Sequence, residues 1–311
     1  MKKVAVLVTF LLIVLQAADA QKVGLVLSGG GAKGAAHIGV IKALEENDIP
    51  IDYITGTSIG SIIGSLYAMG YSPDEMLELM LSEEFSYWQT GTVENEYKYY
   101  FKRPDPTPEF GHFSIDMTDS LQIKANFLPQ SLINPIQMNQ AFMALFSQAT
   151  AKAGWNFDNL FVPFRCVGSD IYNKKAIIFK NGDLGDAVRA SMTFPFFFQP
   201  IWKDSIPLFD GGIYDNFPVG PMKEAFHPDF IFGSTVAGGN NKPSNNAYNQ
   251  LETMIMQKTD YDVPEEDGMM VKFSFPTVSL LDFQKAKELM DIGYKRTMSM
   301  IDSIKQRVPR R

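Results

Sequence analysis

Residues 23–44, VGLVLSGGGAKGAAHIGVIKAL, place an apolar strand, three consecutive glycines and a helical pattern in one short stretch. Residues 53–66, YITGTSIGSIIGSL, follow with a second strand, a second glycine-containing turn and a second helix. The apolar spacing predicts strands at Val23–Leu27 and Tyr53–Thr55, and helices at Ala35–Glu46 and Ile59–Met69. This alternation is typical of a parallel sheet with right-handed crossovers, in which ligands bind at the carboxyl ends of the strands. Both glycine-containing turns are therefore expected at that edge of the sheet.

Composition and charge set limits on the class of protein. The chain has 311 residues, of which 45% are hydrophobic and 20% are charged, enough for one large α/β domain or two small ones. A net charge of −7 without any basic stripe argues against a nucleic acid partner. The single cysteine, Cys166, lies in a predicted strand and is expected to be a buried thiol. The basic cluster Lys305, Arg307, Arg310 and Arg311 is either a solvated helix end or a contact with anionic lipid.

The first twenty residues have the pattern of a secretory signal sequence. Lys2 and Lys3 precede an apolar run, Val4–Leu15, and the segment ends in Ala18-Asp19-Ala20. The alternative is a membrane anchor, but the apolar run is shorter than the roughly 20 residues that a membrane span needs. We expect cleavage of residues 1–20 and a mature domain of residues 21–311 that begins at Gln21.

Residues 85–154 interrupt the alternating pattern and form an excursion that could cover a site as a lid. This segment is rich in Tyr, Phe, Gln and Asn, and it shows helical spacing only around Leu121–Phe127 and Pro135–Ala149. Beyond it, further elements are predicted as strands at Phe164–Val167, Ala176–Phe179, Phe230–Ser234 and Val271–Phe275, and a closing helix at Asp282–Arg307.

The first glycine turn does not fit a nucleotide site well. Gly29-x-Gly31-x-x-Gly34 matches the dinucleotide fingerprint, which also requires an acidic residue at the end of the next strand. Asp52 is near the required distance but precedes its strand. A phosphate-binding loop would need Lys and Ser or Thr after Gly34, where this chain has two alanines.

The second turn carries a candidate nucleophile. Gly56-x-Ser58-x-Gly60 between a strand and a helix is a nucleophile elbow, with Gly56 and Gly60 allowing strand and helix to approach. Attack by Ser58 on a carbonyl creates an oxyanion that needs preset N–H donors about 3 Å away. Gly30 and Gly31 are the first candidates for these donors, followed by Gly29 and Ala32. The alternative for each glycine is a role in tight packing of the strand against the helix.

Two residues are candidates for the base that activates Ser58. Asp210 ends a predicted apolar strand and precedes Gly211 and Gly212, which places a carboxylate at the end of a strand. Ser58, Asp210 and His227 also follow the chain order of α/β-hydrolase triads, but His227 precedes a proline at a predicted helix end. We expect His37 to pack locally on the first helix.

The motifs Gly29-Gly-Gly-Ala-Lys-Gly34, Gly56-Thr-Ser-Ile-Gly60 and Asp210-Gly-Gly212, in this order, resemble those of the patatin-like phospholipases. Residues 187–201, AVRASMTFPFFFQPI, resemble the family segment that precedes the Asp-Gly-Gly turn. The resemblance implies a three-layer α/β fold with a mainly parallel central sheet and helices on both faces. It implies a Ser58–Asp210 dyad, and it implies an oxyanion loop comprising Gly29, Gly30, Gly31, Ala32, Lys33 and Gly34.

The resemblance also implies a phospholipase or other lipid acyl hydrolase that works without cofactor or metal and meets the membrane surface peripherally. With the signal sequence, it predicts a bacterial, exported protein that stays in the periplasm, joins the outer membrane or is secreted. Two other functions are kept as alternatives, a patatin-like module that binds lipid without turnover and an esterase that uses His227. Lys33 could orient the glycine loop or meet a lipid phosphate.

Several residues near these motifs allow more than one interpretation. An aspartate base needs a setting of low dielectric, which nearby phenylalanines could supply. The same phenylalanines could be simple core or could line an acyl-chain pocket; they are Phe194, Phe196, Phe197, Phe198 and Phe209. Asp170 is expected to be structural, and Asp215 and Asn216 are expected to shape the loop after Gly212.

Overall fold

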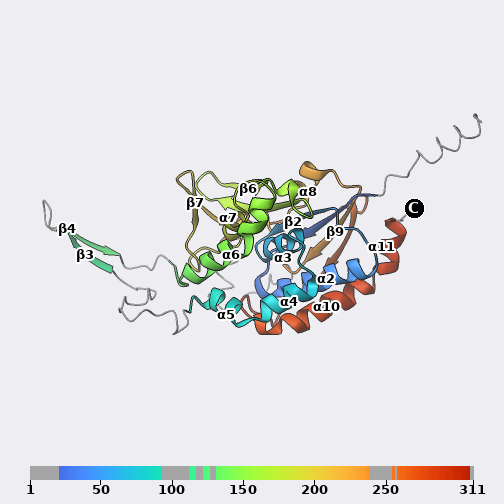
Figure 1. Cartoon of the computed structure of the whole chain (residues 1–311), viewed down its shortest axis with the longest axis horizontal. Helices are drawn as coiled ribbons and strands as arrows, with labels where there is room; N and C mark the ends of the chain where they lie inside the picture. The colour runs from blue at the N-terminus through green and yellow to red at the C-terminus, as the bar shows by residue number, and fades with distance from the viewer. Residues whose placement is uncertain are drawn as a thin grey trace, which may run out of the picture.

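The computed structural model describes residues 21–92, 112–116, 122–126, 131–237, 254–255 and 258–308 (Figure 1). The predicted signal sequence lies outside these residues. An eight-stranded sheet has the order β10-β9-β1-β2-β5-β8-β7, with β6 also paired to β5. Its strands are β1 (Val23–Leu27), β2 (Tyr53–Thr57), β5 (Phe164–Asp170), β6 (Lys175–Phe179), β7 (Ile201–Lys203), β8 (Ile206–Asp210), β9 (Phe230–Thr235) and β10 (Gly268–Lys272).

The sheet is mixed, and its parallel part carries both glycine turns. Strands β10, β9, β1, β2 and β5 pair in parallel, as the pattern of the first 66 residues predicts. Strands β6 and β8 run antiparallel to β5, and β7 runs antiparallel to β8. The predicted mainly parallel sheet is thus confirmed in its central strands, and one side is an antiparallel extension.

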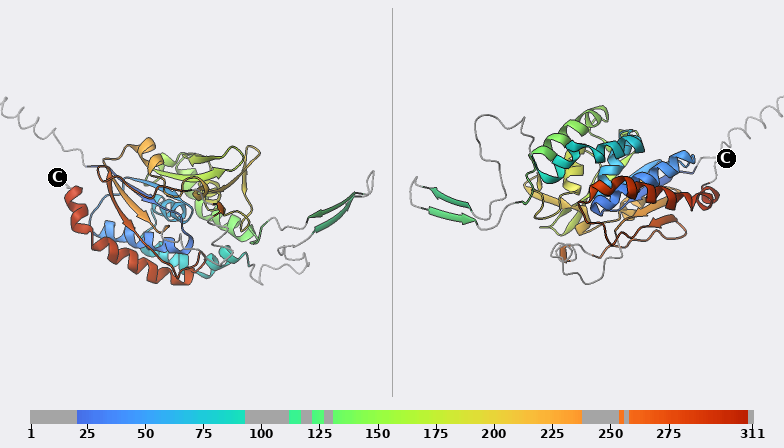
Figure 2. Two further views of the ribbon diagram at one scale, coloured as in Figure 1. Left: turned by 180° about the vertical axis from the view of Figure 1, so that it is seen from behind. Right: turned by 90° about the horizontal axis from the view of Figure 1, so that it is seen from below.

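Helices cover both faces of the sheet and give three layers (Figures 1 and 2). Strand β1 shows why, because its alternate residues enter different cores. Leu25 and Leu27 belong to the larger core, which also includes buried residues of α2 (Ala35–Glu46), α3 (Ile59–Ala68) and α10 (Ala286–Met298). Val26 belongs to the smaller core on the other face, with Met222 of α8 (Val219–Phe226).

Helices α2 and α10 lie against one another at unusually short range, and two glycines permit this. A Cβ added at Gly39 of α2 would stand 2.0 Å from the carbonyl oxygen of Met290. A Cβ at Gly293 of α10 would stand 2.1 Å from the carbonyl oxygen of Ala36. The two backbones therefore pack directly against each other, which fixes the position of α2 and of the glycine turn at its start.

Four further helices contribute buried residues to the larger core. They are α4 (Pro73–Leu81), α5 (Glu83–Thr90), α6 (Ile136–Lys152) and α7 (Leu184–Ser191). Helices α5 and α6 come from the predicted excursion, and much of the segment between them lies outside the described residues. Its role as a lid stays a prediction. Within the described ranges, no helix is both long enough and apolar enough to cross a bilayer.

Some elements differ from the sequence prediction. The helical spacing around Leu121–Phe127 is wrong, because Gln122–Asn126 forms β4, paired antiparallel with β3 (His112–Asp116). Apolar periodicity over seven residues cannot separate a strand from one helical turn. The strand predicted at Val271–Phe275 ends earlier, at Lys272. The closing helix is divided into α10 and α11 (Ile301–Arg307), with a break at residues 299–300.

Candidate active site

Ser58 lies between β2 and α3 in a backbone conformation that non-glycine residues rarely adopt. Its φ is 54° and its ψ is −123°, the strained geometry expected of an elbow that presents a side chain at a strand end. Two close approaches explain the flanking glycines. A Cβ at Gly56 would stand 2.3 Å from the carbonyl oxygen of Gly60, and one at Gly60 would stand 2.5 Å from that of Leu27.

Neighbouring side chains hold the backbone of this elbow. The N–H of Ser58 donates to the hydroxyl of Ser191, at the end of α7, over 3.1 Å. The hydroxyl of Ser61 donates to the carbonyl oxygen of Ser58 over 2.6 Å. Ser191 and Ser61 are fully buried. These two hydrogen bonds therefore hold the peptide groups before and after Ser58 in place.

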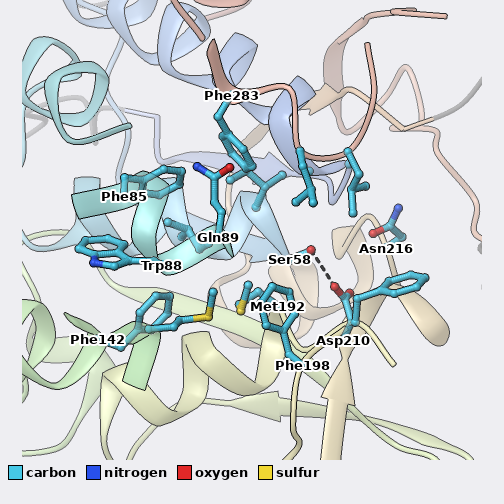
Figure 3. A pocket seen from close by; sticks show the side chains of 18 residues that line it. Ser58, Phe85, Trp88, Gln89, Phe142, Met192, Phe198, Asp210, Asn216 and Phe283 are labelled. Carbon is cyan, nitrogen blue, oxygen red and sulfur yellow. Dashed lines mark hydrogen bonds between the residues drawn. The ribbon is translucent and has the colours of Figure 1, made fainter. Parts of the chain in front are cut away.

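Asp210 ends β8 and brings its carboxylate directly to Ser58 (Figure 3). The hydroxyl of Ser58 donates to Asp210 Oδ2 over 2.7 Å. The backbone N–H of Gly212 donates to Oδ1 over 2.8 Å and orients the carboxylate. Gly211 is required between them, because a Cβ there would stand 2.1 Å from the carbonyl oxygen of Val167. The structure therefore brings the two predicted residues together, with Asp210 only 2% exposed.

The backbone N–H groups of the glycine turn are of two kinds, those that already donate a hydrogen bond and those that do not. Gly29 N–H donates to the carbonyl oxygen of Asn216, and Ala32 N–H donates to that of Leu280. Among the described residues, the amides of Gly30 and Gly31 have no acceptor, and both residues line the pocket beside Ser58. Both glycines have positive φ, 151° and 60°, which favours glycine at these positions. Of the predicted donors, Gly30 and Gly31 are therefore the ones available to an oxyanion.

Lys33 and Gly34 belong to the short 3-10 turn η1 (Gly31–Gly34) that leads into α2. Gly34 allows this turn to approach α3, since a Cβ there would stand 2.4 Å from side-chain atoms of Ile59. Lys33 is half-buried and does not line the pocket. Its suggested contact with a lipid phosphate stays a prediction.

Beneath the glycine turn lies a buried hydrogen-bond network centred on His37. His37 Nε2 is 3.0 Å from the carbonyl oxygen of Ser28, and Nδ1 is 2.8 Å from the hydroxyl of Ser234. A carbonyl can only accept, so Nε2 carries the proton and Nδ1 accepts from Ser234. Complete burial lowers the pKa of His37 to about 4, and the ring is neutral at physiological pH. The residue predicted to pack locally thus ties β1 to β9 directly before Gly29.

The hydroxyl of Ser28 completes this network. It donates to the carbonyl oxygen of Gly29 over 2.9 Å and accepts from the N–H of Val236 over 3.0 Å. Val236 in turn packs on the turn itself, because a Cβ at Gly30 would stand 2.7 Å from its side chain. The contacts with Ser28 and Val236 therefore hold in place the peptide groups that present the free amides.

An apolar pocket, partly open to solvent, extends from Ser58 (Figure 3). Its aromatic side chains come from α5, α6, the segment after α7 and the segment before α10. The lining residues are Gly30, Gly31, Ser58, Ile59, Ile62, Phe85, Trp88, Gln89, Met138, Phe142, Met192, Phe194, Phe198, Asp210, Asn216, Leu280, Leu281 and Phe283. A pocket with this apolar and aromatic lining suits a hydrocarbon chain that ends at a polar reacting group.

The phenylalanines before Asp210 divide into different environments. Phe194 and Phe198 are buried and line the pocket, which supports the acyl-pocket interpretation for these two. Phe196 is 58% exposed and has a φ of 70°. Phe197 and Phe209 are half-buried and do not line the pocket.

His227 does not reach Ser58. It caps the carboxyl end of α8 in a left-handed conformation and is exposed to solvent. It lies three residues before the start of β9 at Phe230, which pairs with Val23 at the amino edge of the parallel strands. Ser58 follows β2 at the opposite edge, so the triad that uses His227 is wrong on geometric grounds.

The other singled-out polar residues have structural environments. Asp170 accepts from the backbone N–H groups of Tyr172 and Asn173 in the turn after β5, and these bonds lower the pKa of its carboxyl. Cys166 is buried, and burial raises the pKa of its thiol. In the described part of the chain, no group of three His, Cys, Asp or Glu side chains is placed to hold a metal ion.

Sequence reasoning missed much of the pocket wall. The aromatic residues of α5 and α6 were predicted only as part of an excursion, and Leu280 and Leu281 carried no signal. Asn216 was predicted to shape a loop, and its backbone does so, yet its side chain also lines the pocket. An asparagine between the Asp-Gly-Gly turn and a Phe-Pro step was the only available sequence clue.

Comparison with known proteins gives a family and several relatives. The family model for patatin-like phospholipase matches residues 25–223. Lysophospholipase NTE1 of Pyricularia oryzae is 32% identical over 216 residues, covering 70% of this chain. Lysophospholipase NTE1 of Coccidioides immitis is 29% identical over 316 residues, covering 92% of this chain. The chain spans 12% and 18% of the length of these two relatives.

The crystal structure of VipD from Legionella pneumophila resembles the chain with a TM-score of 0.48 and 15% sequence identity. The likeness covers 92% of this chain and 68% of that structure. The two relatives described above are fungal, so the expectation of a bacterial, exported protein stays a prediction.

Proposed function

Because this chain belongs to the patatin-like phospholipase family, we propose that it is a serine-dependent lipid acyl hydrolase with Ser58 as nucleophile. The observation that carries the proposal is the 2.7 Å hydrogen bond from Ser58 to Asp210 at the end of an apolar pocket. The names of the fungal relatives, lysophospholipases, add support for a lipid ester as substrate.

In the first half of the reaction, Ser58 attacks the ester carbonyl while Asp210 takes its proton. The proton goes to Oδ2, the oxygen already bonded to the hydroxyl, while the Gly212 amide holds Oδ1 in place. Charge then develops on the former carbonyl oxygen, where the amides of Gly30 and Gly31 are available as donors. Collapse of this intermediate expels the alcohol, which takes the proton back from Asp210.

In the second half, a water molecule replaces the alcohol. Asp210 takes a proton from this water as it attacks the acyl-enzyme, and returns the proton to Ser58 when the fatty acid leaves. Throughout, the acyl chain lies among the aromatic residues of α5 and α6. Burial of each methylene there supplies about 0.8 kcal/mol of binding free energy.

Purified protein tests this proposal with a p-nitrophenyl ester and with vesicles of monoacyl and diacyl phospholipids. We expect hydrolysis by the wild type and labelling of Ser58 by a fluorophosphonate, mapped by peptide mass. Ser58→Ala should abolish both, and Asp210→Asn should lower kcat/KM by roughly a hundredfold to ten-thousandfold with the fold retained.

His227→Ala is the matched control, because it changes the alternative base without touching the pocket. Loss of activity in this variant, or full activity in Ser58→Ala, would contradict the dyad. Vesicle binding by every variant without turnover in any would instead identify a lipid-binding module.

A further inference from the structure

Asn216 carries a buried polar atom that the proposed reaction does not use. The residue is 7% exposed and lies in the loop between Asp210 and α8. Its backbone carbonyl accepts from Gly29, its backbone N–H donates to Thr259 Oγ1, and its side-chain Nδ2 donates to Tyr261 Oη. Its Oδ1 is buried and, among the described residues, receives no hydrogen bond. Three of its four polar groups thus have partners in the protein, the fourth has none, and the residue lines the pocket.

This oxygen stands beside the nucleophile. Oδ1 is 2.2 Å from the point where a Cβ of Gly29 would stand, and the Cβ of Ser58 is 3.0 Å from the same point. Glycine at position 29 therefore leaves the room that brings the two groups together. The hydrogen bond to Tyr261, 2.8 Å long, holds the carboxamide with its oxygen toward Ser58 (Figure 3).

The residues that line the pocket differ on the two sides of Ser58. Phe85, Trp88 and Phe142 lie on one side of the nucleophile, and Asn216 lies on the other (Figure 3). An ester bound at Ser58 extends in two directions, as an acyl chain and as the alcohol to which it is joined. The aromatic side accommodates the acyl chain, so the alcohol part of the substrate extends toward Asn216.

We infer that Asn216 Oδ1 accepts a hydrogen bond from a free hydroxyl of the alcohol part, close to the ester that is cleaved. This inference rests on the proposed function and refines it. Among the alcohols that an acyl ester can carry, those that keep a hydroxyl near the ester give this unpaired acceptor a partner. Asn216 is therefore a specificity-determining residue that favours esters whose alcohol part keeps a free hydroxyl beside the ester.

A matched set of substrates isolates this hydrogen bond. The hydroxyethyl, propyl and methoxyethyl esters of one fatty acid differ only at the end of the alcohol, as a donor, an apolar group and an acceptor. We expect wild-type kcat/KM to be about tenfold higher for the hydroxyethyl ester than for the other two. In Asn216→Leu, which is close in size and has no acceptor, we expect the three values to become equal.

Two further measurements separate this role from a structural one. A general defect in the loop would lower kcat/KM for all three esters alike and keep their ratios. Thr259→Val removes the acceptor of the Asn216 backbone N–H without changing the carboxamide, and its ratios should equal those of the wild type. If Asn216→Leu does not fold, Asn216→Ala takes its place, with thermal unfolding as the check.

The inference about Asn216 can be tested by binding even if the protein does not hydrolyse these esters. Ser58→Ala binds intact ester, so the affinities for the hydroxyethyl and propyl esters can be compared with and without Asn216→Leu. A preference for the hydroxyl that Asn216→Leu removes supports the inference whatever the turnover. Equal affinities and rates for the three esters in the wild type would overturn it. Equal preference for the hydroxyethyl and methoxyethyl esters would also overturn it, since the amide would then present Nδ2.

Discussion

The buried imidazole of His37 should make the stability of the fold depend on pH. Burial lowers the pKa of His37 from 6.5 to about 4, whereas in the unfolded chain the ring has its ordinary pKa. Between these two pH values the unfolded chain binds a proton that the folded chain does not. The free energy of unfolding therefore falls as the pH decreases through this range. At about 1.4 kcal/mol per pKa unit, the loss attributable to His37 is about 3 kcal/mol between pH 7 and pH 4.

Denaturant unfolding of the wild type and of His37→Gln, measured from about pH 7 to about pH 4, isolates this contribution. Glutamine keeps one donor and one acceptor for Ser28 and Ser234 but does not titrate in this range. The difference in unfolding free energy between the two proteins should therefore shrink as the pH falls. Nitrogen NMR of the ring gives an independent check and should show the Nε2–H tautomer down to about pH 5.

Two results would refute this reasoning. The first is a pH-independent difference between the wild type and His37→Gln, which would mean that the ring titrates alike in the folded and unfolded states. The second is a His37 ring that takes up its proton near its ordinary pKa in the folded protein. Either would show that the network below the glycine turn is accessible to water.

Three further predictions concern the elbow, the pocket and the amino terminus. Ser191→Ala leaves the N–H of Ser58 without its acceptor, so the free energy of unfolding should fall by about 1 to 3 kcal/mol in a denaturant titration; an unchanged midpoint would contradict this. Trp88→Ala should extend the pocket and shift the optimum of kcat/KM toward longer fatty acyl chains, with about a fourfold gain for each additional buried methylene; an unchanged chain-length profile would place the chain elsewhere. Intact mass of protein exported from a secreting host should give Gln21 as the first residue, and retention of residues 1–20 would favour the anchor.

Local sequence patterns were sufficient to predict the elements that form the candidate active site. The helix predicted at Ala35–Glu46 has the same bounds in the structure, and the Ser58 elbow has the predicted strand and helix on either side. These features depend on neighbours in the chain, namely apolar periodicity and glycines at turns. Asp210 could also be placed, because it ends an apolar strand directly before two glycines.

Features that depend on distant parts of the chain could not be predicted. Nothing near Asn216 in the sequence indicates that Tyr261 would orient its carboxamide toward Ser58. His37 is similar, since its two partners belong to β9 and to the residue after β1. The antiparallel pairing of β8 with β5, which delivers Asp210, likewise arises only in the assembled sheet.

The central position of β1 has a consequence for synthesis of the protein. One edge of this strand can pair with β2 soon after both strands are synthesised. Its other edge pairs with β9, which begins at Phe230 and is synthesised much later. A nascent chain therefore carries an open strand edge in the middle of its future sheet until most of its length has left the ribosome, a state prone to aggregation. Asp210 is also translated after Ser58, so the hydrogen bond between the two side chains cannot form until β8 has been made.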